Sequence, residues 1–153
     1  MNVQLQCVVL DCPDPALLAR FYGELLGGEV DRPDRRWSLD ADWSTVHPPS
    51  GPVLAFQRVP DHRPPSWPDP ARPQQFHLDF GVPDPAAAGR RVLALGARLL
   101  SADEEERGWA VYADPAGHPF CLVREGVGGA EGAGGAEGAA VGEGANAGTA
   151  QGG

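Results

Sequence analysis

The sequence contains one pattern twice, and this internal repeat limits the possible folds more than any other feature. Pro-Asp-Pro-Ala occurs at 13–16 and again at 83–86, each time directly after an apolar segment. Further along, Trp37 aligns with Trp109 and Phe56 with Phe120. The register between the two copies shifts only in segments where loops would absorb insertions. A repeat of this length indicates one structural unit that is used twice.

Each copy predicts a strand, a helix and then three more strands. In both copies an apolar segment is followed by Asp-Pro, which is typical of a helix cap and a first helical residue. The apolar stripe of the first helix stops at Gly27-Gly28, and the second helix is expected to end at Gly96. The expected strands are 5–11, 29–31, 36–42 and 53–59 in the first copy, and 76–82, 97–100, 109–113 and 119–124 in the second.

A unit with its helix on one face of a sheet leaves the other face in need of a partner. Two such units predict an α+β fold in which tandem βαβββ modules curl into an incomplete barrel, with the helices outside. We place this domain at 1–124, with modules at about 3–59 and 76–124 and a proline-rich linker at 60–75. Residues 125–153 are mostly Gly, Ala and Glu, so we expect a disordered tail.

Composition excludes several classes of function. A net charge of −9 without a basic stripe argues against nucleic acid as a partner. No apolar run approaches the roughly 18 residues of a membrane span, so no membrane partner is expected. The sequence has no lysine, which excludes Schiff-base chemistry. Its 3 cysteines lack CxxC spacing, which favours a reducing cytoplasm over a disulfide scaffold.

The two modules would direct four side chains into a shared hollow. Cys7 and His77 occupy equivalent places in the first strands, and Gln57 and Cys121 in the last strands. Asp79 shares the strand face of His77, where it would act as a base or orienting carboxylate, or pair with an arginine. His77 itself remains open to three roles: metal ligand, general base, or hydrogen-bonding residue of the wall.

A hollow of this kind is the default place for a small-molecule ligand. Trp37, Phe56 and Trp109 are the aromatic residues expected to form its walls. Trp67, among the prolines of the linker, would either cover a ligand or pack the linker onto one module. The histidines at 47, 62 and 118 are expected in loops, with structural or solvent-exposed roles.

The sequence resembles the vicinal oxygen chelate superfamily, which includes glyoxalase I, bleomycin-resistance proteins and extradiol dioxygenases. The resemblance rests on the doubled strand and Asp-Pro helix start, on Phe-Tyr and Leu-Leu-Gly in the first half, and on the Asp-Pro-Ala-Gly-His turn. A more specific likeness, to bacterial glyoxalase-like domains, rests on Trp67-Pro68-Asp69 and His77-Leu78-Asp79. Together with the intervening strands, the resemblance to the superfamily covers nearly all of 3–124.

This resemblance implies a divalent metal (zinc, nickel or iron) held by His, Glu or Gln from the first and last strand of each module. The corresponding positions here are Cys7, Gln57, His77 and Cys121, of which only His77 and Gln57 have the usual ligand chemistry. The cofactor is therefore either absent or one divalent metal. If both cysteines converge with His77, they resemble the Cys₂His set of a catalytic zinc.

Three functions remain as alternatives. The favoured one is a small-molecule-binding protein with an altered or lost metal site, similar to the drug-sequestering branch that works without metal. The second is a metal-dependent lyase or isomerase of the glyoxalase type, with Asp79 moving a proton. The third is a thiol-dependent reaction at Cys7 or Cys121, with His77 as base. The modules could close within one chain or exchange across a homodimer.

Overall fold

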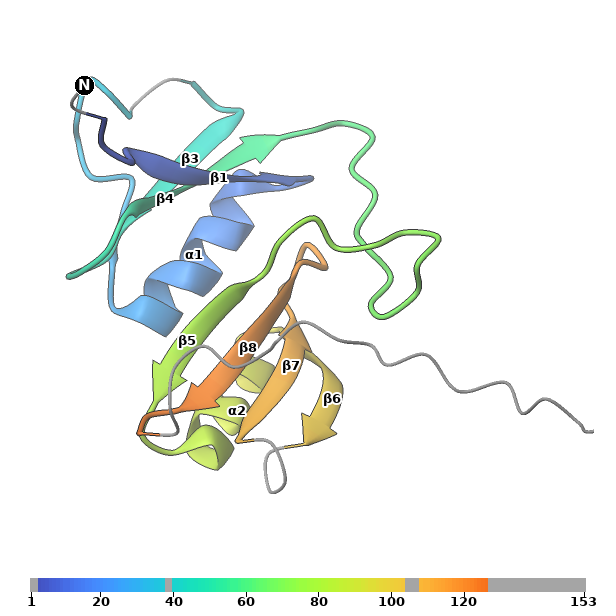
Figure 1. Ribbon diagram of the computed structural model, residues 1–153. Coiled ribbons are helices and arrows are strands. Elements are labelled where there is room, and N and C mark those ends of the chain that lie inside the picture. The colour runs from blue at the N-terminus through green and yellow to red at the C-terminus, as the bar shows by residue number, and fades with distance from the viewer. Residues whose placement is uncertain (1–2, 38–39, 104–107, 127–153) are drawn as a thin grey trace, which may run out of the picture.

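The protein consists of two βαβββ modules, each a four-stranded sheet with one helix (Figure 1). The computed structural model describes residues 3–37, 40–103 and 108–126. The first module contains β1 (Cys7–Cys12), α1 (Pro15–Leu26), β2 (Glu29–Val30), β3 (Trp43–His47) and β4 (Val53–Arg58). The second contains β5 (Leu78–Val82), α2 (Pro85–Ala94), β6 (Arg98–Asp103), β7 (Trp109–Ala113) and β8 (Pro119–Arg124). The predicted α+β fold of tandem modules without a closed barrel is confirmed for the residues that the structure describes.

Both helices begin at matched aspartate caps. The Asp14 carboxylate accepts a hydrogen bond from the Leu17 N–H, and the Asp84 carboxylate accepts one from the Ala87 N–H, each at 3.0 Å. A proline follows each cap at the first helical position, where no N–H is needed. The repeated Asp-Pro pair therefore fixes the start of each helix, as predicted.

The first strand of each module pairs in parallel with the last one. The strand orders are β1-β4-β3-β2 and β5-β8-β7-β6, so β1 and β5 are edge strands of their sheets. In the first sheet Val9 lies opposite Ala55, and in the second sheet Asp79 lies opposite Cys121. The other neighbouring strands are antiparallel. Identical order in both sheets confirms that one unit is used twice.

The third strand of the first module begins later than the sequence suggested. The prediction of a strand at 36–42 is wrong, because the described residues of this segment form turns and coil, and β3 begins at Trp43. Short aspartate side chains explain the difference: Asp34 accepts a hydrogen bond from the Arg36 N–H, and Asp40 accepts one from the Asp42 N–H, each at 2.9 Å. Such local bonds compete with a sheet ladder.

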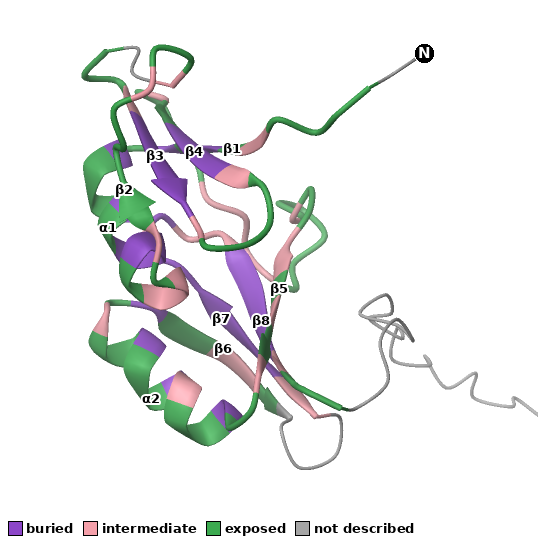
Figure 2. Cartoon of the chain, turned by 90° about the vertical axis from the view of Figure 1, so that its left-hand side faces the viewer, coloured by how far each residue is buried: buried purple, intermediate pink, exposed green. Residues whose placement is uncertain are grey.

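A single hydrophobic core spans both modules, and α1 lies between them. The ring centroid of Phe21 is 5.9 Å from that of Phe120, and Tyr22 is 6.2 Å from Phe80. On its other side Tyr22 stacks on Phe56 at 5.5 Å. Figure 2 shows buried residues along β3, β4, β7 and β8 and on the inner sides of both helices. The expectation that both helices lie outside is therefore wrong for α1.

Two further segments lie outside the modules, one between them and one after the second. Residues 60–75 connect them without forming a helix or a strand. Of the tail predicted at 125–153, all but Glu125 and Gly126 lies outside the described residues. Within the described part of the chain, neither helix combines the length and apolar character that crossing a membrane requires.

Candidate functional site

The sheet face turned away from the core carries most of the residues that the sequence singled out. In β5, Leu78, Phe80 and Val82 pack against the core. Because side chains alternate along a strand, Asp79 points to the opposite face. His77, directly before the strand, continues this alternation. The corresponding open face of β1 carries Cys7, Val9 and Asp11.

On the open face of the second module, His77, Asp79 and Cys121 come together. One ligand-type atom from each residue lies within 4.8 Å of the other two. The Nε2 atom of His77 is 3.4 Å from Oδ1 of Asp79, and the Cys121 thiol donates a hydrogen bond to the Asp79 carboxylate. The adjacent parallel strands β5 and β8 place Asp79 directly opposite Cys121. Two neighbouring strands of one sheet therefore hold all three donors.

The electrostatic environment keeps the thiols protonated. Burial raises the pKa of Cys121 to about 12, and the hydrogen bond and negative charge of Asp79 act in the same direction. Burial also raises the pKa of Cys7 and raises that of Cys12 to about 11. A thiolate is the nucleophilic form of cysteine. These shifts argue against a thiol-dependent reaction at Cys7 or Cys121 in the protein as it stands.

Cys7, one of the two first-module positions predicted to bind metal, does not join this cluster. Cys7 is half-buried on β1 and is not among the clustered residues. Gln57 is exposed on β4 and lies opposite Asp11. Within one chain, therefore, the structure does not bring the predicted set of four together.

The strand register also changes which first-module residue corresponds to Cys121. Val9 and Asp79 precede their Pro-Asp-Pro-Ala segments by the same distance, and they lie opposite Ala55 and Cys121. Ala55 is thus the structural counterpart of Cys121, and Gln57 lies two residues further along the strand. The sequence alignment of Gln57 with Cys121 is wrong for this reason.

A cavity of about 840 Å³ lies where the first sheet, the linker and the second module meet. Asp11 and Gln57 contribute polar groups from the open face of the first sheet, and His118 contributes one from the turn before β8. The volume is within the range of pockets that hold small organic molecules. Most of the remaining wall is apolar and is formed by Val9, Leu10, Tyr22, Trp43, Val59, Pro64, Pro65, Pro73, Phe76, Leu78 and Pro119.

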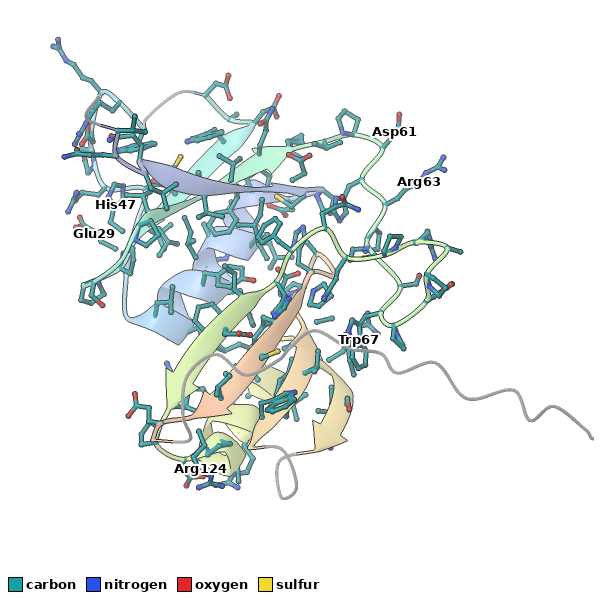
Figure 3. The ribbon with its side chains drawn as sticks, viewed as in Figure 1. Glu29, His47, Asp61, Arg63, Trp67 and Arg124 are labelled. Carbon is teal, nitrogen blue, oxygen red and sulfur yellow. The ribbon has the colours of Figure 1, made fainter. Side chains whose placement is uncertain are left out.

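None of the four aromatic residues expected around a ligand lines this cavity. Phe56 is fully buried against Tyr22, so its assignment to a ligand-facing wall is wrong. Trp37 packs edge-on against His47 at 6.4 Å, and Trp109 lies on β7. Trp67 extends from the linker toward the second sheet (Figure 3).

The aromatic residues that line the cavity are Tyr22, Trp43 and Phe76, and sequence reasoning assigned none of them to a ligand-facing wall. Trp43 is the one whose strand was misplaced. It escaped notice because the strand was placed too early, which aligned Trp37 rather than Trp43 with Trp109. The same error put His47 in a loop, whereas His47 ends β3 and is 6% exposed. A pattern that could have found both is the run Trp43-Ser-Thr-Val-His47, which has the β-branched and aromatic content of a strand.

A buried polar cluster joins the two modules beside the cavity. The Asp114 carboxylate accepts hydrogen bonds from the Tyr22 hydroxyl at 2.9 Å and from Nδ1 of His118 at 2.8 Å. It also accepts from the backbone N–H groups of Ala116 and His118, at 2.8 and 3.0 Å. Nε2 of His118 is 2.9 Å from the backbone oxygen of Asp11. Because both partners of the ring are acceptors, this arrangement favours the protonated ring, in which both nitrogens donate.

This charge predicts a pH-dependent stability. Burial disfavours the charged ring, but the hydrogen bond and charge of Asp114 outweigh it, and the pKa of His118 is raised. Because the pKa of His118 is raised in the folded state, the protonated ring contributes its full stabilisation at pH values below the unfolded pKa of about 6.5. This stabilisation is lost as the pH rises through the folded pKa. We expect the stability advantage of the wild type over His118→Gln, measured by urea unfolding, to shrink over that window. A difference that stays constant from pH 6 to 9 would contradict the charge assignment.

Comparison with known proteins identifies relatives of this fold. The family model of the glyoxalase-like domain matches residues 7–123. A glyoxalase-related enzyme from Fulvimarina pelagi is 24% identical, with a TM-score of 0.56 over 79% of this chain and 87% of that one. A glyoxalase/bleomycin resistance protein/dioxygenase family enzyme from Burkholderia phytofirmans is 18% identical, with a TM-score of 0.60 over 80% and 98%.

A third related structure contains a bound drug. It is the bleomycin-binding protein of Streptomyces verticillus, complexed with copper(II)-bleomycin, which is 19% identical with a TM-score of 0.50. The match covers 81% of this chain and 98% of that one. The comparison with curated proteins found no match. At these identities the structural likeness establishes the fold.

Proposed function

We propose, on the premise that this chain belongs to the glyoxalase-like domain family, that it binds a small organic molecule in the cavity between its modules. The observation that carries this proposal is the cavity of about 840 Å³ at the junction of the first sheet, the linker and the second module. The proposal includes a metal site that differs from the family pattern, and it is supported by the absence of Cys7 from the cluster of His77, Asp79 and Cys121. A bleomycin-binding relative shows that this fold can serve such a purpose.

The lining of the cavity suits a ligand of mixed character. An apolar body would lie against Trp43, Phe76 and Leu78, because burial of apolar surface is the main source of affinity in such pockets. A polar end would reach Gln57 and the Asp11 carboxylate on the first sheet. The linker closes one side, and Asp61 and Arg63 point outward from it (Figure 3).

Filling the cavity is expected to abolish most of this binding. In a Gln57→Trp variant the indole would occupy space now open beside Asp11. We expect the affinity for 1-anilinonaphthalene-8-sulfonate, a fluorescent apolar probe, to fall about tenfold or more, equivalent to about 1.4 kcal/mol. The measurement is a fluorescence titration that gives both affinity and stoichiometry.

The matched control is Gln6→Trp, which adds the same side chain at an exposed position outside the cavity. It is expected to bind the probe like the wild type. Equal affinity in the Gln57→Trp variant, or the lack of a saturable site in the wild type, would contradict the proposal.

The clustering of His77, Asp79 and Cys121 favours a second candidate, a metal-dependent lyase or isomerase of the glyoxalase type. This candidate needs Cys7 and Gln57 from a second copy of the chain, because one chain does not bring the four positions together. The open sheet faces offer a surface for such a homodimer, with Val9 39% exposed. Sedimentation equilibrium decides whether a dimer forms, and a strictly monomeric chain would remove this candidate.

A further inference from the structure

We propose that His77, Asp79 and Cys121 form a metal site for zinc or a similar borderline cation, contained entirely in the second module and open at one coordination position. Among the described residues, these three are the group of histidine, cysteine and acidic side chains whose donor atoms converge. The site would use Asp79, which the ligand positions of the superfamily do not include. It requires nothing from Cys7 or Gln57.

The distances between donor atoms suit a single ion. Two ligands bound to zinc at about 2.0–2.1 Å in tetrahedral geometry are about 3.3 Å apart. Nε2 of His77 and Oδ1 of Asp79 are already 3.4 Å apart. The sulfur atom of Cys121 is within 4.8 Å of one ring nitrogen of His77 and one carboxylate oxygen of Asp79, so side-chain rotation would bring all three donors onto one ion. Side chains on two paired strands also need little ordering before they bind.

The chemistry of the donor set narrows the class of cation. One imidazole nitrogen, one carboxylate oxygen and one sulfur suit zinc and its cobalt substitute, whereas magnesium and calcium prefer oxygen ligands. The sulfur of Cys121 lies within 4.8 Å of a carboxylate oxygen of Asp79 and carries its proton while no cation is bound. A cation there would replace that proton. Three protein ligands leave a fourth position for water or a ligand atom, the arrangement that lowers the pKa of bound water.

A fourth residue lies close enough to the His77 imidazole to orient it. The side-chain amide of Gln74 is 3.4 Å from Nδ1 of His77. Amide oxygen and nitrogen atoms exchange places by a simple flip, so the oxygen can accept from Nδ1–H and leave Nε2 free for the metal. Metal-bound histidines commonly have such a partner on the other ring nitrogen, and its loss costs about 10–100-fold in affinity. Gln74 is therefore a positioning residue of the proposed site.

This metal site is physically separate from the ligand cavity. None of His77, Asp79 and Cys121 lines the cavity, because Leu78, between His77 and Asp79, faces the core side of β5. Metal binding and probe binding are therefore independent measurements. The failure of one proposal leaves the other standing.

Titration of the metal-free full chain with Co²⁺ tests the proposal directly. A cobalt–thiolate bond produces a charge-transfer band in the near ultraviolet, and competition with Zn²⁺ should remove it. We expect one Co²⁺ per chain with this band in the wild type, and loss of the band in Cys121→Ser. His77→Ala and Asp79→Asn should weaken binding by at least the 10–100-fold expected for Gln74→Leu.

Matched controls change the same residue types elsewhere. Cys7→Ser and His62→Ala alter residues outside the cluster and should leave the band and the affinity unchanged. His77 and Asp79 are not fully buried, so their variants are expected to fold even if Cys121→Ser does not. Circular dichroism of the metal-free proteins checks folding.

Two outcomes would overturn the metal site itself, and a third would overturn its assignment to one module. One is the lack of a charge-transfer band in the wild type at saturating Co²⁺. The other is unchanged binding in both His77→Ala and Asp79→Asn. If Cys7→Ser also abolishes the band, the site draws on the first module, and the one-module assignment is wrong.

Discussion

Replacement of Asp114 by alanine is expected to lower the free energy of unfolding by about 3–5 kcal/mol, the range for breaking a buried ion pair from one side. The Asp114 side chain is fully buried and is the common acceptor for Tyr22, His118 and two backbone N–H groups. Without it, the Tyr22 hydroxyl loses its partner inside the core and the charged His118 ring loses its counterion. Both losses penalise the folded state.

Urea unfolding followed by circular dichroism measures this effect. Tyr22→Phe removes only one bond of the cluster, so it should cost about 1 kcal/mol. Asp61→Ala is the matched control, because Asp61 is an exposed aspartate on the linker. If Asp114→Ala were no more destabilising than Asp61→Ala, the polar cluster would not be what joins the modules.

The second large effect is expected for Phe120→Ala, at about 3–5 kcal/mol. The Phe120 ring is fully buried, and its centroid lies 5.7 Å from that of Tyr112 and 5.9 Å from those of Phe21 and Phe80. Phe120 therefore touches α1 of the first module as well as its own sheet. A cavity at this point removes contacts from both modules at once.

Because one core serves both modules, the destabilised protein should still unfold in a single transition. Tryptophan fluorescence and far-ultraviolet circular dichroism are expected to give coincident urea curves for the wild type and Phe120→Ala. Leu99→Ala, at a position that is 46% exposed, is the control and should have a small effect. Two separate transitions would show that the modules fold independently.

The sequence was sufficient for the fold because the decisive signals are local. An aspartate cap followed by proline specifies a helix start within four residues, and its repetition at Asp14 and Asp84 revealed the duplication. The strand at 43–47 was misplaced because alternation in 36–42 looked similar. The competing side-chain bonds of Asp34 and Asp40, and the β-branched and aromatic content of 43–47, distinguish the two segments.

The candidate site was harder to predict because it depends on how the modules pack. Tyr22 and Asp114 are far apart in the sequence, and no periodic pattern shows that α1 will lie between two sheets. His77 and Asp79 could be placed on one face from the strand period alone, and the register added Cys121. The absence of Cys7 from that group depends on how the two modules pack around α1, which the sequence does not display.

The pairing of the first strand with the last in each module has a consequence for synthesis on the ribosome. While β1 emerges, its partner β4 has not yet been translated, so the N-terminal strand stays unpaired until residue 58 has left the exit tunnel. The same delay holds for β5 and β8 in the C-terminal half. The N-terminal sheet can therefore be complete once residue 58 is outside the tunnel, whereas the aromatic side of α1 must wait for the C-terminal half before water is excluded from it.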